Sequence, residues 1–221
     1  MNAFDIETIP NQAMVEFMIE PEVALGNLKD PEKIKEKIAE AKAKAIDRMA
    51  LSPLYGRVYS ASFYGKTIQE YRVIPEISDA AEIELLNYIF ENISLGGNDA
   101  ESPKIITWNG LNFDFPFIYK RAALLRVALP VGCPGLKYWT QKYRSDVHCD
   151  LMQELCSWNI QDKISLDVAG KIFLGEGKTK RDYSTYVSLI ESGQGNLIGL
   201  DNLCDTKLTF DLYNLLSPYL F

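Results

Sequence analysis

The sequence predicts one α/β domain, and three observations lead to this fold class. The chain has 221 residues, which suits one sizeable domain with its own hydrophobic core. Segments with strand-like composition come mainly in the first part of the chain, whereas helical periodicity dominates the later part. No internal repeat or low-complexity tract divides the sequence. We therefore expect residues 1–221 to form a single domain, with a charged helical insertion at about residues 11–52.

The first expected element is a strand over residues 2–7. Asp5 and Glu7 lie two residues apart in it, so an extended backbone places both side chains on the same face. They alternate with Phe4 and Ile6, as expected for a strand that enters a core.

A helix is expected over residues 30–49, where Asp30 can cap the first turn and Pro31 can begin it. Its apolar residues recur at helical spacing: Ile34, Ile38, Ala41, Ala45 and Met49. The rest is mostly Lys and Glu, and we expect it to form a solvated outer face. The alternative is a lid or guide whose lysines contact the phosphates of a charged substrate.

A β-hairpin is expected next, with strands over residues 57–64 and 68–74. Ser78-Asp79 can then cap a helix that reaches about residue 93. The apolar face of this helix is expected to contain Ile83, Leu86 and Phe90.

The later elements follow from shorter signals. An apolar run at residues 104–108 predicts a buried strand, which Asn109-Gly110 ends. The other expected elements are a helix over 113–127, a strand continuing into a helix over 147–157, helices over 166–173 and 182–192, and a last helix over 198–216 that ends near Ser217-Pro218. GEGKT at residues 175–179 lacks the full spacing of a phosphate-binding loop and is expected to be an ordinary loop.

Composition restricts the classes of protein. The formal net charge of −7 argues against binding nucleic acid through bulk electrostatics, although a local basic patch and bound cations could still support an enzyme that acts on it. No apolar run approaches a membrane span, and the N-terminus has no signal-like region, so we expect a cytoplasmic protein with no membrane partner. Without zinc-like spacing, Cys133, Cys149, Cys156 and Cys204 are expected to be free buried thiols.

Carboxylates in three separate segments form a candidate metal site: Asp5, Glu7, Asp114 and Asp205. Carboxylate oxygens are suitable ligands for Mg²⁺ or Mn²⁺, and one Mg²⁺ usually takes only one or two of them from the protein. Four converging carboxylates therefore predict two divalent cations, which at a spacing of ~3.5–4 Å can hydrolyse a phosphodiester. Each acid also has an ordinary interpretation, as a charge at a strand end, a helix cap or a surface helix residue.

The surroundings of these acids resemble a known family. FDIET, WNGLNFDFPFI and LDNLCDTKLTFDLYNLL are similar, in this order, to the three motifs of the DEDD 3′–5′ exonucleases. The sequence most resembles the predicted exonucleases related to the proofreading domain of family-B DNA polymerases. Further similarity runs through SPLYGRVYSASFYG and HCDLMQEL, so the resemblance covers nearly the whole chain.

The resemblance implies a ribonuclease H-like fold, in which a mixed central sheet has helices on both sides and the acids gather at one edge. It implies that Asp5 bridges two metal ions, that Glu7 and Asp205 share the ion that activates water, and that Asp114 holds the other ion mainly through water. The positions that would flank the terminal nucleotide are Thr8, Ile9, Asn109 and Phe113.

The implied activity is metal-dependent 3′–5′ exonuclease cleavage of nucleic acid, with single-stranded DNA as the preferred substrate. A polymerase or another replication or repair protein is a possible partner in trans. Two other functions stay open: a catalytically weakened or inactive nucleic-acid-binding module on the same fold, and an endonuclease or resolvase.

One position departs from the family pattern. The family has Tyr four residues before the last Asp, or His five residues before it, to orient or deprotonate the attacking water. This chain has Asp201 and Leu200 there. Asp201 lies one helical turn before Asp205 and could accept a proton, add a metal ligand, or be a solvated residue of a weakened enzyme. Tyr183 and Tyr186 could supply a hydroxyl, but the sequence does not place them at the site.

Two further polar residues are expected to have structural roles. His148, the single histidine, is expected to stabilise the fold. Asp150 is expected to cap a helix or to accept hydrogen bonds inside the protein.

Overall fold

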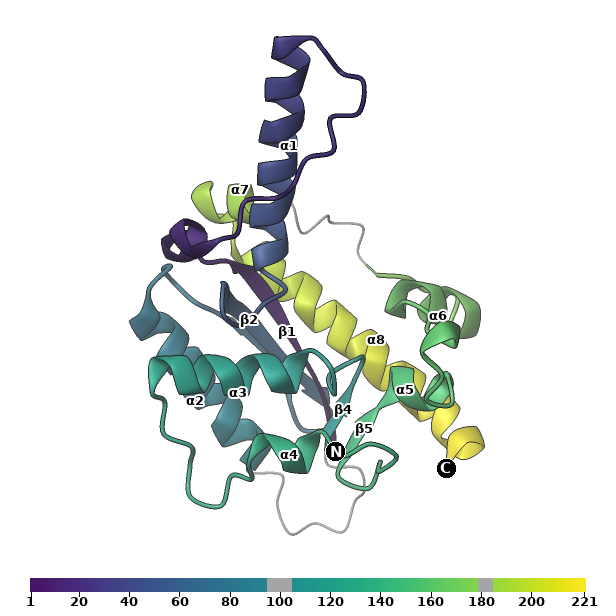
Figure 1. Cartoon of the computed structure of the whole chain (residues 1–221). Helices are drawn as coiled ribbons and strands as arrows, with labels where there is room; N and C mark the ends of the chain where they lie inside the picture. Colours follow the sequence, from purple (N-terminus) through teal and green to yellow (C-terminus); the bar gives the residue numbers. More distant parts are fainter. Residues whose placement is uncertain (95–104, 179–184) are drawn as a thin grey trace.

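The described residues form a five-stranded mixed sheet in the order β3-β2-β1-β4-β5. A computed structural model describes residues 1–94, 105–178 and 185–221 (Figure 1). The strands are β1 (Asn2–Pro10), β2 (Gly56–Gly65), β3 (Gln69–Val73), β4 (Ile105–Thr107) and β5 (His148–Asp150). β1 pairs antiparallel with β2 and parallel with β4, while β2–β3 is antiparallel and β4–β5 is parallel. The predicted α/β class, the mixed sheet and the hairpin are thus confirmed.

Helices cover both faces of the sheet (Figure 1). They are α1 (Pro31–Met49), α2 (Asp79–Ser94), α3 (Asp114–Leu125), α4 (Leu136–Trp139), α5 (Leu151–Leu155), α6 (Leu166–Phe173), α7 (Tyr186–Glu191) and α8 (Asn196–Leu220), with the 3₁₀ helices η1 (Gln12–Phe17) and η2 (Ile160–Asp162). None of the helices in the described part of the chain combines the length and apolar composition needed to cross a membrane.

Alternation along β1 divides the hydrophobic core into two layers. Phe4 and Ile6 pack with residues of α2 and α3 on one face of the sheet. Ala3 packs with residues of α8, including Leu212, on the other face. Because side chains alternate along a strand, the carboxylates of β1 lie on the α8 side.

Among the element boundaries that differ from those expected, three have a local physical cause. β1 continues past Glu7 to Pro10, because its pairing with β2 continues there across a register shift. α3 ends at Leu125, two residues early, because Arg126 adopts a left-handed conformation with φ of 58°. α8 runs through Pro218 to Leu220. The proline removes one N–H donor near the helix end, where residue 214 is exposed and water can bond the freed carbonyl.

Several expectations lie wholly or partly outside the described residues, among them Tyr183 and the last residue of the GEGKT segment. The strand expected over 104–108 is described from residue 105, and the helix expected over 182–192 is described as α7, from residue 186 to 191. The predicted change from strand to helix over 147–157 is confirmed by β5 and α5.

The buried face of α2 differs from the predicted one. Leu86 and Phe90 are fully buried, as expected, but Ile83 is only partly buried and Glu82 takes the core position. Glu82 is tolerated there because Arg121 and Arg57 pair with it. Apolar periodicity could not predict this, because the compensating charges come from β2 and α3.

The charged insertion forms the part of the molecule that extends farthest from the sheet, with α1 projecting outward (Figure 1). The Asp30 carboxylate caps α1 by accepting a 3.0 Å hydrogen bond from the Glu32 N–H, as predicted. Met49 is the one residue of the apolar stripe that is buried, while Ile38 is 46% exposed. The solvated outer face is confirmed, while Ile34, Ala41 and Ala45 of the stripe are half-buried.

The four cysteines are free thiols, as predicted, but they are not all buried. Cys149 and Cys156 are buried, Cys133 is half-buried and Cys204 is exposed. Cys204 is exposed because it lies on the outer face of α8, next to the inward-facing Asp205.

Candidate active site

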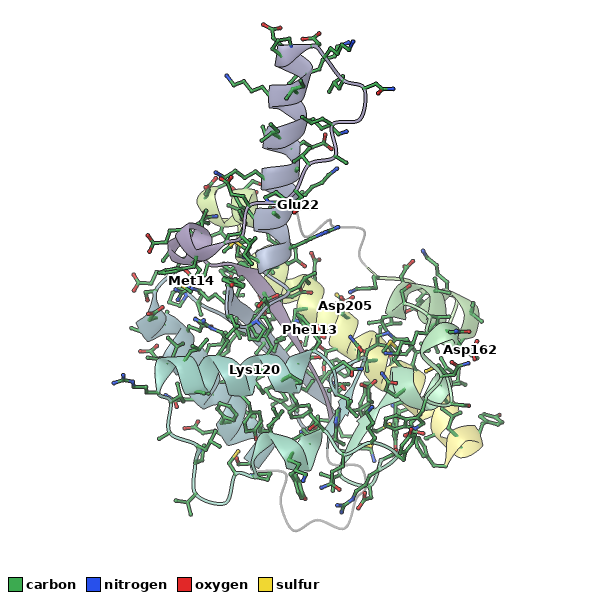
Figure 2. The ribbon with its side chains drawn as sticks, in the orientation of Figure 1. Met14, Glu22, Phe113, Lys120, Asp162 and Asp205 are labelled. Carbon is green, nitrogen blue, oxygen red and sulfur yellow. The ribbon has the colours of Figure 1, made fainter. Side chains whose placement is uncertain are left out.

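The site is formed where the carboxylates of β1 meet the side chains of α8. Oxygen atoms of Asp5, Glu7 and Asp205 all lie within 4.8 Å of one another. Asp5 and Glu7 are adjacent on one face of the strand, as predicted, and α8 crosses that face with Asp205 inward and 4% exposed. Figure 2 labels Asp205 in the middle of the molecule, in the same part of the view as Phe113 ahead of α3.

Asp114 reaches the same region from the other side of the sheet. β4 pairs with β1 at Asn2 and Ala3, and β4 ends at Thr107, so the later part of β1 can accept another partner on this edge. The Asp114 Oδ1 atom occupies this position and accepts a 3.1 Å hydrogen bond from the Ile6 N–H. Asp114 is 1% exposed and is the first residue of α3, after the N-cap Phe113, so its carboxylate does more than cap its own helix: it also bonds β1.

Each of these four carboxylates has a described hydrogen-bond donor. Beside the bond from Ile6 to Asp114, the Asn202 amide donates a 2.7 Å hydrogen bond to Asp5 Oδ2. The Lys178 ammonium forms an ion pair with Asp205, and the Tyr186 hydroxyl is hydrogen-bonded to Glu7. The donors come from β1, α8, α7 and the segment after α6, so tertiary folding assembles the site.

The electrostatics of the site favour protonation of the acids when no cation is bound. Burial, followed by the charges of neighbouring acids, raises the pKa of Asp5 well above its usual value. Burial raises the pKa of Glu7 to about 7, although Lys178 acts against it, and burial raises the pKa of Asp114 to about 8. The pKa of Asp205 is also raised by burial, despite Lys178. The site therefore disfavours the charged forms of its carboxyl groups until a cation binds.

The donors themselves are held in their protonated forms. Burial alone would lower the pKa of Lys178, but the charges of Asp205 and Asp5 raise it. Burial and the charge of Glu7 raise the pKa of Tyr186, so its hydroxyl keeps the proton that it donates.

Asp201 belongs to the same charged region. It lies one turn before Asp205 on α8, is 9% exposed, and interacts electrostatically with Glu7 and Tyr186. The prediction that Asp201 and Asp205 share a helix face is confirmed, and Asp201 is not a solvated surface residue.

A buried polar network shapes the loop between β4 and α3. Asp150 caps α5 and also accepts 3.0 Å hydrogen bonds from the N–H groups of Asn109 and Leu111. Asn109 has a φ of 69°, a conformation that asparagine tolerates better than most residues. His148 lies between the Thr107 hydroxyl (2.8 Å) and the Trp139 carbonyl (2.6 Å). The structural roles expected for Asp150 and His148 are confirmed.

The residues expected to flank a nucleotide are placed unevenly. Asn109 and Phe113 are partly exposed near the start of α3, and the Phe113 ring contacts Phe117 at a centroid distance of 5.5 Å. Ile9 is 1% exposed, and the Thr8 hydroxyl donates a 2.7 Å hydrogen bond to the Ala50 carbonyl. The structure therefore brings Asn109 and Phe113 to the surface, but not the side chains of Thr8 and Ile9.

The donor set fits hard divalent cations. Asp5, Glu7 and Asp205 offer converging carboxylate oxygens, and Asp114 adds a buried fourth carboxylate close to Asp5. Oxygen-rich sites of this kind suit Mg²⁺ or Mn²⁺, and the charge of a bound cation would offset the burial and the mutual repulsion that raise the pKa values of the acids.

Sequence reasoning missed two of the donors and left a third unplaced. Lys178 lies in the GEGKT segment interpreted as an ordinary loop, and Asn202 was not considered. Asn202 lies between Asp201 and Asp205 on the same helix, and this position could have identified it as a candidate site residue. Tyr186 is a candidate from the sequence, but the sequence cannot place it at the site, because no local pattern connects α7 to β1.

Comparisons with known proteins show the family of this chain. The family described as "predicted 3′–5′ exonuclease related to the exonuclease domain of PolB" matches residues 54–217. This range contains Asp114, Asp201 and Asp205, while Asp5 and Glu7 lie before it. DNA polymerase 1 of Pyrococcus abyssi is 28% identical over 117 residues, which are 49% of this chain and 15% of that protein.

The fold also resembles a solved polymerase structure. The family B DNA polymerase from the hyperthermophilic archaeon Pyrobaculum calidifontis superposes with a TM-score of 0.58 and 18% identity, over 98% of this chain and 24% of that one. The likeness shows the expected ribonuclease H-like fold of a polymerase exonuclease domain. The chain thus spans only a small part of the polymerases that it matches.

Proposed function

Because the chain belongs to the family of predicted 3′–5′ exonucleases related to the exonuclease domain of PolB, we propose that it removes nucleotides from the 3′ end of a nucleic-acid strand using two divalent cations. The observation that carries this proposal is the convergence of Asp5, Glu7 and Asp205, with Asp114 joining them from the other side of the sheet. Mg²⁺ or Mn²⁺ would supply an activated water and would stabilise the leaving oxygen.

The residues of this chain would divide the work as follows. Asp5, Glu7, Asp114 and Asp205 would hold the cations; Asp114 and Asp205 are buried, and Asp5 and Glu7 are half-buried. Asn202 fixes the Asp5 carboxylate by a hydrogen bond. The Lys178 ammonium lies beside Asp205, where it could also contact a phosphate of the substrate. Asn109 and Phe113 lie where a terminal nucleotide could contact them, and Thr8 and Ile9 would act through the backbone.

The substrate and the partners are the finer part of the proposal. Single-stranded DNA is the first choice, because the similar proteins are DNA polymerases. A polymerase or another replication or repair protein acting in trans would deliver the 3′ end.

The test is an exonuclease assay on 5′-labelled single-stranded DNA and RNA with Mg²⁺ or Mn²⁺. The wild-type chain should produce a ladder of shortened products, and Asp5→Ala and Asp205→Ala should each abolish it. Asp211→Ala is the matched control, because Asp211 is an acid on α8 that pairs with Lys207. The absence of a ladder from the wild-type chain with every substrate and metal would overturn the proposal.

Asp201 favours a second candidate, a nucleic-acid-binding module with weakened or no catalysis. Its carboxylate stands where the family has the water-orienting tyrosine. Asp201→Tyr separates the two: a large gain in cleavage supports the weakened module, whereas a loss shows that Asp201 works in the active enzyme. An endonuclease would instead cut a closed circular strand, which has no 3′ end.

A further inference from the structure

The helix α7 contributes a side chain to the site that its sequence position does not reveal. Tyr186 is the first residue of α7, is 6% exposed, and its hydroxyl is hydrogen-bonded to Glu7. It also interacts electrostatically with Asp201 and Asp205, so the hydroxyl lies among the acids of both β1 and α8.

The position of Tyr186 is fixed by packing. Its ring belongs to the same core cluster as Ile198 of α8, and Ile190 of α7 packs against that cluster. The turn between α7 and α8 lies tightly against β2: a Cβ atom on Gly195 would come within 1.9 Å of the Tyr59 hydroxyl. A side chain held in this way is suited to orient a neighbour.

The four donors at the acids differ in charge. Lys178 partly neutralises Asp205, whereas the Tyr186 hydroxyl is neutral and orients Glu7 without cancelling its charge. A carboxylate has two oxygens and several lone pairs, so Glu7 can accept this hydrogen bond and still bind a cation. Groups that orient a metal ligand in this way typically change metal affinity or activity by roughly 10–100-fold when they are removed.

We propose that Tyr186 is a positioning residue of the exonuclease site, and that its hydroxyl holds the Glu7 carboxylate in the orientation that binds the cation. The expected effect of Tyr186 on catalysis rests on the proposed function, whereas its expected effect on metal binding does not.

The test compares Tyr186→Phe with Tyr88→Phe. Tyr88 is a matched control, because it is 5% exposed and its hydroxyl donates a 2.5 Å hydrogen bond to a glutamate, Glu70 of β3. Mn²⁺ affinity is measured by titration with detection of free Mn²⁺ by electron paramagnetic resonance. The kcat and KM are measured on 5′-labelled single-stranded DNA.

Tyr186→Phe should weaken Mn²⁺ binding and lower kcat, each by roughly 10–100-fold, with KM unchanged, while Tyr88→Phe should match the wild type in all three values. Equal Mn²⁺ affinity in Tyr186→Phe and Tyr88→Phe would overturn the inference. If the wild-type chain cleaves no strand, the proposed exonuclease function fails, and the Mn²⁺ titration alone still decides the role of Tyr186.

Discussion

Glu82 and Asp114 are both almost completely buried, at 0% and 1% exposure, yet their surroundings are opposite in charge. Glu82 receives hydrogen bonds of 2.8 and 2.7 Å from the Arg121 guanidinium and 2.9 Å from the Val58 N–H, and Arg57 lies at 3.3 Å. Asp114 accepts a hydrogen bond from the Ile6 N–H, and its charged neighbours include Asp5, Asp150 and Glu7.

The difference distinguishes a structural charge from a functional one. A buried ion pair with good geometry can offset its own desolvation, as around Glu82. A group of buried acids with Lys178 as its described cationic partner is left with excess negative charge. That excess costs stability and is typical of a site that binds cations.

The largest effect is expected from Glu82→Gln, which leaves the buried Arg121 guanidinium without its carboxylate and leaves Arg57 with Asp79 alone. Removing one partner of a buried ion pair typically costs ~3–5 kcal/mol in the free energy of unfolding. Urea unfolding followed by circular dichroism measures it. A cost below ~1 kcal/mol would show that Glu82 does not balance these charges.

Asp114→Asn should have the opposite sign in metal-free protein at pH 9. The amide keeps an oxygen that can accept the Ile6 N–H bond, while the repelled charge is removed. We expect a gain on the order of 1 kcal/mol in the same urea experiment, together with loss of exonuclease activity. Destabilisation as large as that of Glu82→Gln would contradict the comparison.

The metal-free protein should lose stability as pH rises. Because folding raises the pKa of Glu7 from 4.5 to about 7 and that of Asp114 from 3.8 to about 8, the folded state holds more protons than the unfolded state. This stabilisation is complete below the unfolded pKa values and is lost as pH rises through the folded ones. Thermal melts from pH 4.5 to 9 in EDTA should show the decline, and excess Mg²⁺ should flatten it. Parallel curves with and without Mg²⁺ would argue against a cation site.

The smallest effect is expected in α1, the helix of the charged insertion. Ile38→Ala removes a side chain that is 46% exposed, so the free energy of unfolding should change by no more than about 0.5 kcal/mol. Leu86→Ala on α2, where the side chain is fully buried, should cost ~2–5 kcal/mol in the same assay. Similar costs for the two would mean that the apolar stripe of α1 is covered in solution.

Local sequence patterns predicted most of the fold, because each helix cap or strand alternation was compatible with only one kind of secondary structure. Asp30 with Pro31 begins α1, and alternation defines the β2–β3 hairpin. The predictions failed where a distant group intervened. Glu82 replaced Ile83 in the core because arginines from two other elements pair with it.

The candidate site shows the same division. Order and context predicted that Asp5, Glu7, Asp114 and Asp205 belong together, and the structure brings them together. The donors Asn202, Lys178 and Tyr186 could not be assigned, because amides, lysines and tyrosines are common and only their positions make them specific.

The sequence by itself determined the order of the elements, the face of β1 that carries Asp5 and Glu7, and the shared face of Asp201 and Asp205 on α8. These properties follow from the periods of strand and helix, which are local. Only the tertiary structure decided that Asp114 enters beyond the end of β4 and that Tyr186 reaches Glu7 from α7. These contacts join residues distant in sequence, and packing of the whole chain places them.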